Sequence, residues 1–292
     1  MKPAPFTYHR PTTLAEALEL LERHGEEAKI LAGGQSLVPV MNFRLATPER
    51  LIDINRVPEL CGCRIGDGTV RLGALTRHRE LLSLEDLRTA APLLPMIAPS
   101  IGHPQIRCSG TFGGSLSHAD PSAELPGAVL ALDATMVISS SRGERRVPAR
   151  EFFLSYFTTV LEPDEILTAV EFPACGPGEG AAFREVAARQ GDFALAGAAA
   201  VVTVAEDDVI TDARLAAISV SDVPVRLTEA EKVLRGQTPT PDILTELRSA
   251  VQDVLEPTAA AKASAAYKKR TTAALAARVA EQAWRTAQRR TA

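Results

Sequence analysis

The chain opens with the apolar pattern of an amphipathic helix. Residues 14–24 repeat leucine at three- and four-residue spacing, which places those side chains on one helical face. Thr12 or Thr13 can cap the first turn, Glu16 stands where it completes a capping box, and Gly25 follows the last turn. The pattern therefore predicts one capped helix near the N-terminus.

Shorter apolar runs predict strands through the rest of the first half. They lie at residues 3–9, 29–32, 50–54, 63–65 and 69–72, with Gly66-Asp67-Gly68 as the hairpin turn between the last two. Residues 81–98 predict a helix interrupted at Pro92 and Pro95, and residues 147–157 and 165–172 complete an α+β unit.

The second half has a different order of elements. Apolar runs predict three strands, at 183–188, 196–205 and 213–220, followed by three helices, at 229–234, 242–255 and 262–287. A segment rich in proline and glycine, residues 173–180, separates the halves. We therefore expect an α+β protein with a first domain at 1–175, in subdomains of about 1–56 and 57–175, and a second at 176–292.

Composition narrows the class of protein. Hydrophobic residues make up 46% of the chain, and a net charge of −4 offers no basic face for nucleic acid. Apolar runs such as 193–205 are too short and alanine-rich to span a membrane, and the N-terminus lacks the apolar core of a signal peptide. We expect a cytoplasmic protein. The four cysteines, Cys61, Cys63, Cys108 and Cys175, lack the paired spacing of a metal site, so we expect no metal cluster here.

Two glycine pairs carry the strongest chemical signal. Gly33-Gly34-Gln35-Ser36 follows a predicted strand, and Gly113-Gly114-Ser115 lies in the stretch 103–121, which is rich in glycine and hydroxyl side chains. Taken alone, that stretch is equally typical of a polar loop and of a backbone shaped for a ligand. Two such turns with free N–H groups could together hold a diphosphate. Neither matches a Rossmann or Walker motif.

Patterns for nucleophilic catalysis are missing. The chain has no Gly-x-Ser-x-Gly elbow, and its five histidines show no metal-ligand spacing. Asp120 and Glu124 form a carboxylate pair four residues apart. We expect them to accept hydrogen bonds from ribose hydroxyls or to cap the following turn, since a catalytic pair normally lies in a deeper apolar setting.

Several runs resemble a known family. The run Ala32–Met41, then residues 44–48 and 51–54, closely resembles the FAD-binding medium subunits of molybdenum hydroxylases. These include the medium subunit of aerobic carbon monoxide dehydrogenase and the flavin part of xanthine dehydrogenase. Further matches follow in the family's order over nearly the whole chain, at residues 104–107, 110–114, 119–126, 191–194 and 267–268.

The resemblance implies a fold and a cofactor. The expected fold is a two-part FAD-binding domain of the vanillyl-alcohol-oxidase-like type, followed by a smaller domain with a three-stranded antiparallel sheet and helices. FAD would be bound non-covalently. The implied diphosphate-lining residues are Ala32, Gly33, Gly34, Gln35, Ser36, Leu37, Thr111, Gly113, Gly114 and Ser115.

The remaining implied site residues lie around the ribose and the flavin ring. Asp120 and Glu124 would lie near the ribose, Ile101 against the isoalloxazine, and Asp192 with Phe193 where the second domain covers the flavin. For Ile101 the side chain alone is equally typical of a core position. The chain departs from the family pattern at Ser115, Ser117, His118, Arg184 and Glu185, the last two replacing a lysine common there. The cluster 268–270 we interpret as a solvated face or a subunit contact.

The resemblance also implies a function. A large molybdopterin subunit would oxidise the substrate, and a small subunit with 2Fe–2S clusters would pass electrons to FAD on this chain and on to an external acceptor. A dimer of such heterotrimers is expected. Carbon monoxide, purines and N-heterocycles all stay open as substrates, and NAD, oxygen and quinones as acceptors. The alternatives are a stand-alone flavin reductase with its own substrate and a non-catalytic assembly module.

Overall fold

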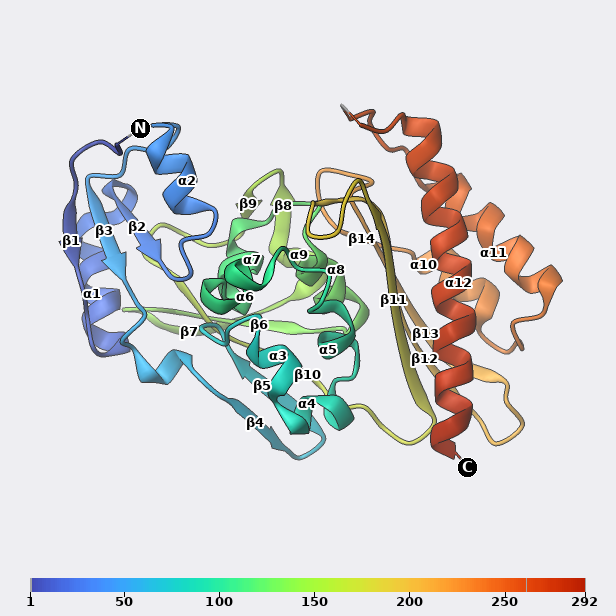
Figure 1. The fold of residues 1–292 in the computed structure, drawn as a ribbon. Coiled ribbons are helices and arrows are strands. Elements are labelled where there is room, and N and C mark those ends of the chain that lie inside the picture. Colours follow the sequence, from blue (N-terminus) through green and yellow to red (C-terminus); the bar gives the residue numbers. More distant parts are fainter. Residues whose placement is uncertain (1, 261, 292) are drawn as a thin grey trace.

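The computed structural model describes residues 2–260 and 262–291. Its strands form three main sheets and one small two-stranded sheet. Figure 1 shows the three main sheets following one another along the molecule, from the N-terminal part through a central part to a C-terminal sheet covered by long helices. No helix in the described ranges is both long and apolar enough to cross a lipid bilayer.

The N-terminal lobe, residues 2–57, is built on a parallel sheet in the order β1–β3–β2. Ile52 of the central strand is fully buried and belongs to the same apolar cluster as Leu21 of α1. The capping box is present: the Thr13 side chain accepts a hydrogen bond from the Glu16 N–H, and the Glu16 carboxylate accepts one from the Thr12 N–H at 2.7 Å. The elements are β1 (Thr7–His9), α1 (Leu14–His24), η1 (Gly25–Glu27), β2 (Ala28–Leu31), α2 (Leu37–Asn42) and β3 (Arg50–Asp53).

The central lobe, residues 58–173, holds an antiparallel sheet in the order β4–β5–β10–β6–β7. Short helices cover it, and every residue of α8 is buried. Its elements are η2 (Pro58–Leu60), β4 (Cys63–Gly66), β5 (Thr69–Gly73), α3 (Glu80–Ser83), α4 (Glu85–Ala90), α5 (Leu93–Ile97), α6 (Pro104–Ser109), α7 (Phe112–His118), α8 (Glu124–Ala131), β6 (Thr135–Ser140), β7 (Gly143–Pro148), α9 (Ala149–Phe152), β8 (Phe153–Ser155), β9 (Thr158–Thr159) and β10 (Ile166–Pro173).

The C-terminal lobe, residues 179–291, is an antiparallel sheet with helices on one face (Figure 1). Small side chains let α12 approach closely: an added Cβ on Gly180 would overlap the backbone of Ala283 and Ala287. Its elements are β11 (Glu179–Ala187), β12 (Ala194–Val204), β13 (Ile210–Ile218), β14 (Val225–Arg226), α10 (Thr228–Leu234), α11 (Pro241–Val254) and α12 (Ala265–Thr291).

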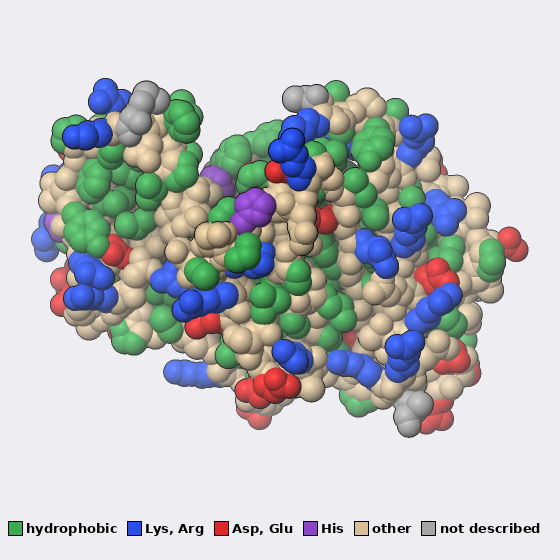
Figure 2. Space-filling model, in the orientation of Figure 1, with side chains coloured by type: hydrophobic (Ala, Val, Ile, Leu, Met, Phe, Trp, Pro, Cys, Tyr) green, Lys and Arg blue, Asp and Glu red, His purple; other side chains and the backbone are tan. Residues whose placement is uncertain are grey.

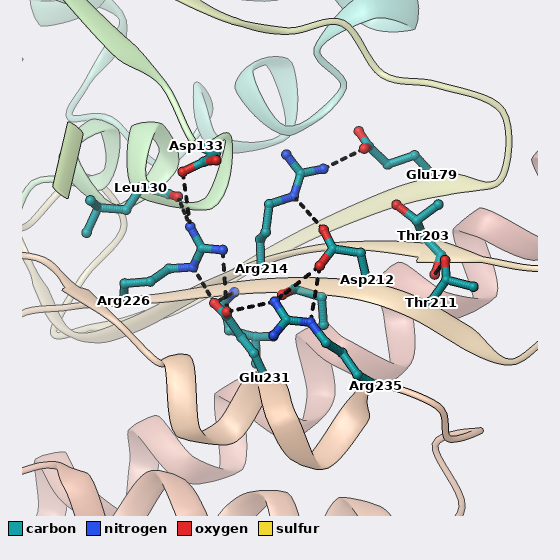
Figure 3. Close-up of polar contacts among 12 residues, drawn as sticks. Leu130, Asp133, Glu179, Thr203, Thr211, Asp212, Arg214, Arg226, Glu231 and Arg235 are labelled. Atoms are coloured by element: carbon teal, nitrogen blue, oxygen red, sulfur yellow. Dashed lines mark hydrogen bonds and ion pairs between the residues drawn. The ribbon is translucent and has the colours of Figure 1, made fainter. Parts of the chain in front are cut away.

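The seam between α8 and the C-terminal sheet is closed by packing and by a hydrogen bond from Arg226. Helix α8 packs against β12 and β13 on the face opposite α12. Figure 3 shows Arg226 reaching across, with Nη1 donating to the Leu130 carbonyl at 2.9 Å while its guanidinium also pairs with Glu231. The Glu231 carboxylate is buried and accepts a further bond from the Leu215 N–H at 2.8 Å. The bond to Leu130 ties the two lobes together, and the Glu231 carboxylate holds the Arg226 guanidinium that makes it.

The expected α+β fold is confirmed, with local corrections. Residues 81–98 show the expected break at Pro92, which caps a new helix, but Pro95 lies inside that helix and a further break occurs at the extended residue Leu84. The C-terminal sheet gains a fourth strand, β14, too short for a sequence pattern to reveal. The stretch 103–121 is largely helical, as α6 and α7, and is not an open loop.

Candidate functional site

The structure brings the two glycine-rich segments into contact. We call residues 33–37 the first glycine segment and residues 110–115 the second. An added Cβ on Gly33 would lie 2.5 Å from the Ser109 carbonyl oxygen and 2.7 Å from the Gly110 Cα. An added Cβ on Gly114 would lie 3.8 Å from the Ala32 Cβ. Only glycine fits at position 33, because any side chain there would overlap Ser109 and Gly110 of the other segment.

The first glycine segment carries unpaired backbone donors. Within the described chain, no group accepts a hydrogen bond from the backbone N–H of any residue from 33 to 37. The Gln35 side chain turns back to donate to the Gly33 carbonyl at 3.1 Å, and Gly34 takes a left-handed φ of 69°. Main-chain N–H groups that meet no protein acceptor can donate to solvent or to a ligand, and successive free ones form concave sites for anions.

The second glycine segment differs from the expectation. The glycine pair lies in the first turn of α7, and Thr111 is the N-cap. Its N–H groups are already used: Gly113 donates to the Ala74 carbonyl at 2.8 Å, Gly114 to the Thr111 hydroxyl at 3.1 Å, and Ser115 to the Thr111 carbonyl at 3.0 Å. The prediction of free N–H groups was wrong for this segment, because the helix and its cap consume them.

The side chain of His78 contacts the second glycine segment, and no pattern in the sequence predicted this contact. Its Nε2 atom lies 2.9 Å from the Thr111 carbonyl, which makes Nε2 the protonated nitrogen. Burial lowers the pKa of His78 to about 4, so the ring is neutral at physiological pH. Its Nδ1 faces Gly110, where an added Cβ would lie 2.8 Å away. The contact partner is 33 residues distant, so no local motif could reveal it.

The loop that carries Asp192 and Phe193 lies against the segment that follows Ile101. An added Cβ on Gly191 would lie 2.7 Å from the His103 ring, which sets the loop before Phe193 against the chain just after Ile101. Phe193 is 60% exposed, whereas Ile101 is 7% exposed and packs in the central core. Asp192 pairs with Lys262 at 3.6 Å. Figure 2 shows histidine side chains beside a hollow between the N-terminal lobe and the rest of the molecule.

Asp120 and Glu124 have different surroundings. Asp120 accepts a hydrogen bond from the Ser122 N–H at 2.9 Å, as a turn-capping residue does. Glu124 is only 5% exposed, which contradicts the expected shallow position: the C-terminal sheet covers α8. Burial, and then the charge of Glu185, raise the pKa of Glu124 to about 8. Glu124 is therefore mostly protonated at neutral pH and can donate a hydrogen bond.

Two more ionisable groups lie at the seam. Burial raises the pKa of Glu185 to about 7 despite a hydrogen bond with Ser100, and its buried Oε2 atom has no partner within the described ranges. Lys268 is buried and donates to the Ser219 carbonyl at 2.8 Å, and burial lowers its pKa. The interpretation of residue 268 as part of a solvated face was wrong, because α12 turns this side chain onto the end of β13.

Comparison with known families decides the assignment. A family model described as "FAD binding domain in molybdopterin dehydrogenase" matches residues 4–175, and one described as "CO dehydrogenase flavoprotein C-terminal domain" matches residues 181–283. The chain belongs to the FAD-binding medium subunits of molybdenum hydroxylases. The sequence resemblance is thereby confirmed, and the chain is an oxidoreductase subunit with an FAD-binding domain.

Individual members of the family are similar over their full length. The chain is 43% identical to the 6-hydroxypseudooxynicotine dehydrogenase complex subunit alpha of Paenarthrobacter nicotinovorans, over 92% of this chain and 90% of that protein. It is 36% identical to the carbon monoxide dehydrogenase medium chain of Hydrogenophaga pseudoflava, over 97% and 99%. The solved structure of carbon monoxide dehydrogenase from that organism superposes with a TM-score of 0.95, covering 98% of this chain and 99% of that one.

The residues of this medium subunit suit the diphosphate of FAD. Five successive unpaired N–H groups in the first glycine segment need acceptors, and phosphate oxygens are strong acceptors. The hydroxyls of Ser115 and Ser117 are half-buried and make no hydrogen bond to the described residues. The two segments meet at glycines, so no side chain stands between them at the contact. Donor set and shape therefore fit the group that the family name specifies.

Proposed function

We propose that this chain binds one FAD non-covalently against the two glycine segments and transfers electrons through it within a molybdenum hydroxylase complex. The observation that carries the proposal is the run of unpaired N–H groups from Gly33 to Leu37 beside the second glycine segment. Successive main-chain donors that face no protein acceptor form a site that favours an anion, which supports the diphosphate as the group bound here.

We propose the following roles for the site residues. The N–H groups of the first segment bind the diphosphate, with Ala32 at its edge. Thr111, Gly113, Gly114 and Ser115 form the opposing wall, to which the Ser115 hydroxyl adds a donor. Asp120 and Glu124 lie at the ribose, where protonated Glu124 donates and Asp120 accepts. Ile101 supports the flavin ring from the core, and Asp192 with Phe193 covers it.

Membership of the family supports a proposal for the partners. The isoalloxazine of FAD accepts and releases electrons, and this chain orients it. We propose that electrons reach it from 2Fe–2S clusters of a small subunit, that a large molybdopterin subunit binds the substrate, and that an external acceptor takes the electrons. The similar Hydrogenophaga protein is named the medium chain of carbon monoxide dehydrogenase, which supports this arrangement. We also propose that the chain divides into domains at residues 175/176.

Reconstitution with FAD tests the site. The full chain is stripped of flavin, and FAD binding is followed by quenching of flavin fluorescence, in wild type and in Gly33→Ala. We expect wild type to bind one FAD and the variant to bind at least about tenfold more weakly, because the new methyl group collides with Ser109 and displaces the first segment.

Gly66→Ala is the matched control. An added Cβ on Gly66 meets nothing within 4 Å, so its FAD affinity should equal that of wild type. Absence of flavin binding by the wild-type chain would refute the proposal. Equal affinity of Gly33→Ala and wild type would instead remove the diphosphate from this position.

A further inference from the structure

The side chains of Asn55 and Arg77 connect the two glycine segments. The Asn55 Nδ2 donates to the Ala32 carbonyl at 2.8 Å, and its Oδ1 accepts from the Arg77 Nη2 at 2.6 Å. The Arg77 Nη1 donates in turn to the Ser109 carbonyl. Asn55 thus holds the residue before Gly33, and Arg77 holds the residue before Gly110. The carbonyl held by Arg77 is also the one that Gly33 approaches most closely.

The orientation of Asn55 is determined by its partners. Its amide nitrogen faces carbonyl and carboxylate oxygens, at Ala32 and at Asp53 (2.6 Å), and its amide oxygen faces a guanidinium. The reversed amide would set donor against donor and acceptor against acceptor. Asn55 therefore acts as a directional connector between a cation on one side and the backbone of the first segment on the other.

Asp53 anchors the connector. Its carboxylate is 6% exposed and accepts from both the N–H (2.9 Å) and the side chain of Asn55, and from the Tyr8 hydroxyl. Burial by itself raises the pKa of Asp53, but the bonds from Tyr8 and Asn55 outweigh it and the pKa lies below its ordinary value. The anchor stays charged at neutral pH, so the amide has a fixed acceptor.

The bond to Ala32 has a consequence for the neighbouring donor. In a trans peptide unit the carbonyl and the following N–H point in opposite directions. Because Asn55 holds the Ala32 carbonyl behind the segment, the Gly33 N–H of the same peptide unit points away from Asn55, on the side where it meets no protein acceptor. The connector therefore sets the direction of the first unpaired donor.

We propose that Asn55 and Arg77 are positioning residues that aim the first glycine segment at the cofactor diphosphate and fix its spacing from the second segment. The proposal rests on the FAD site proposed above. Neither side chain needs to touch the cofactor. A preorganised donor set binds its anion more tightly than one that must be ordered on binding, so loss of the connector weakens binding without removing a donor.

Arg77→Lys is the principal variant, measured in the full chain. Lysine keeps the charge, but a single ammonium cannot replace the guanidinium fork that reaches Asn55 and Ser109 together. We expect the dissociation constant for FAD to rise about tenfold, while the thermal midpoint of the flavin-free chain changes little. The rise in that midpoint on adding FAD should shrink. Asn55→Leu, which removes both bonds of the connector, should weaken binding further.

A direct readout follows the Gly33 N–H itself. In chain labelled with 15N at its 19 glycines, FAD should shift the Gly33 amide resonance in wild type and less in Arg77→Lys. Arg79→Lys, an exposed arginine two residues along, is the matched control and should behave as wild type. An FAD affinity of Arg77→Lys within about twofold of wild type would overturn the proposal. So would a lower flavin-free midpoint with an unchanged FAD increment. Failure of wild type to bind FAD would refute the site itself.

Discussion

Both glycine segments contain a glycine pair, but the glycines have different roles in the two segments. In the first, the glycines leave backbone donors free and allow a close approach to Ser109. In the second, the donors are satisfied by a helix and its cap, and the Cα of Gly113 lies against Ala74 so closely that an added Cβ would overlap it. In our proposal the first segment serves a ligand, whereas the glycines of the second segment serve packing. The same dipeptide can therefore mark a binding site or a tight internal contact.

This contrast predicts the largest effect for Gly113→Ala. The new methyl group overlaps both the Cβ and the backbone of buried Ala74, so α7 must move relative to the end of β5. Overpacking of this kind costs about 2–4 kcal/mol of unfolding free energy. We expect the thermal midpoint of the flavin-free chain to fall by roughly 5–10 °C, measured by circular dichroism.

If Gly113→Ala unfolds at the same temperature as wild type, the packing role assigned to the second segment is contradicted. Gly176→Ala is the control, because an added Cβ on Gly176 meets nothing within 4 Å, and it should leave the midpoint unchanged. Gly33→Ala should lie between the two in stability while losing the most in FAD affinity, since it disturbs a contact between surface segments and no core helix.

The fold was readable because periodicity and capping are local. The repeat of Leu14, Leu18 and Leu21, with Thr13 and Glu16, predicted α1, and the structure has that helix with that cap. At residues 81–98 the break at Pro92 was predicted correctly, whereas the break at Leu84 was missed because the apolar spacing stays helical across it. Patterns report which face is apolar and not where the chain turns.

Only part of the site could be predicted from the sequence, because its other contacts join residues that are distant in the chain. Sequence drew attention to both glycine segments but could not show that Ala74 and Thr111 use up the donors of the second. Glu124 was misplaced for a related reason: its burial comes from a sheet that begins more than 50 residues later. Asn55 and Arg77 went unnoticed, since neither belongs to a motif and their contact exists only in the folded chain.

Acid should affect the second glycine segment through His78. The unfolded ring binds a proton near its ordinary pKa of 6.5, whereas the folded ring, buried against Thr111, does so only near 4. Between these values the unfolded state binds more protons, so stability falls as pH falls, by up to about 1.4 kcal/mol per pH unit. His78→Gln keeps a donor for Thr111 without titrating. Urea unfolding of both proteins between pH 7 and 4 should show a shallower loss for the variant; parallel curves would contradict this.

The smallest effect is expected for Thr111→Val. This variant tests whether the Thr111 hydroxyl caps the helix or binds the cofactor. Valine keeps the shape of the side chain and removes the hydroxyl that accepts from the Gly114 N–H, so the cap of α7 is lost at a cost of about 1 kcal/mol. Since that hydroxyl already serves the helix, the dissociation constant for FAD should change by less than about threefold. Denaturant unfolding and FAD titration of the same preparation measure both. A large loss of affinity with unchanged stability would mean that the Thr111 hydroxyl binds the cofactor, and that both glycine segments serve the ligand after all.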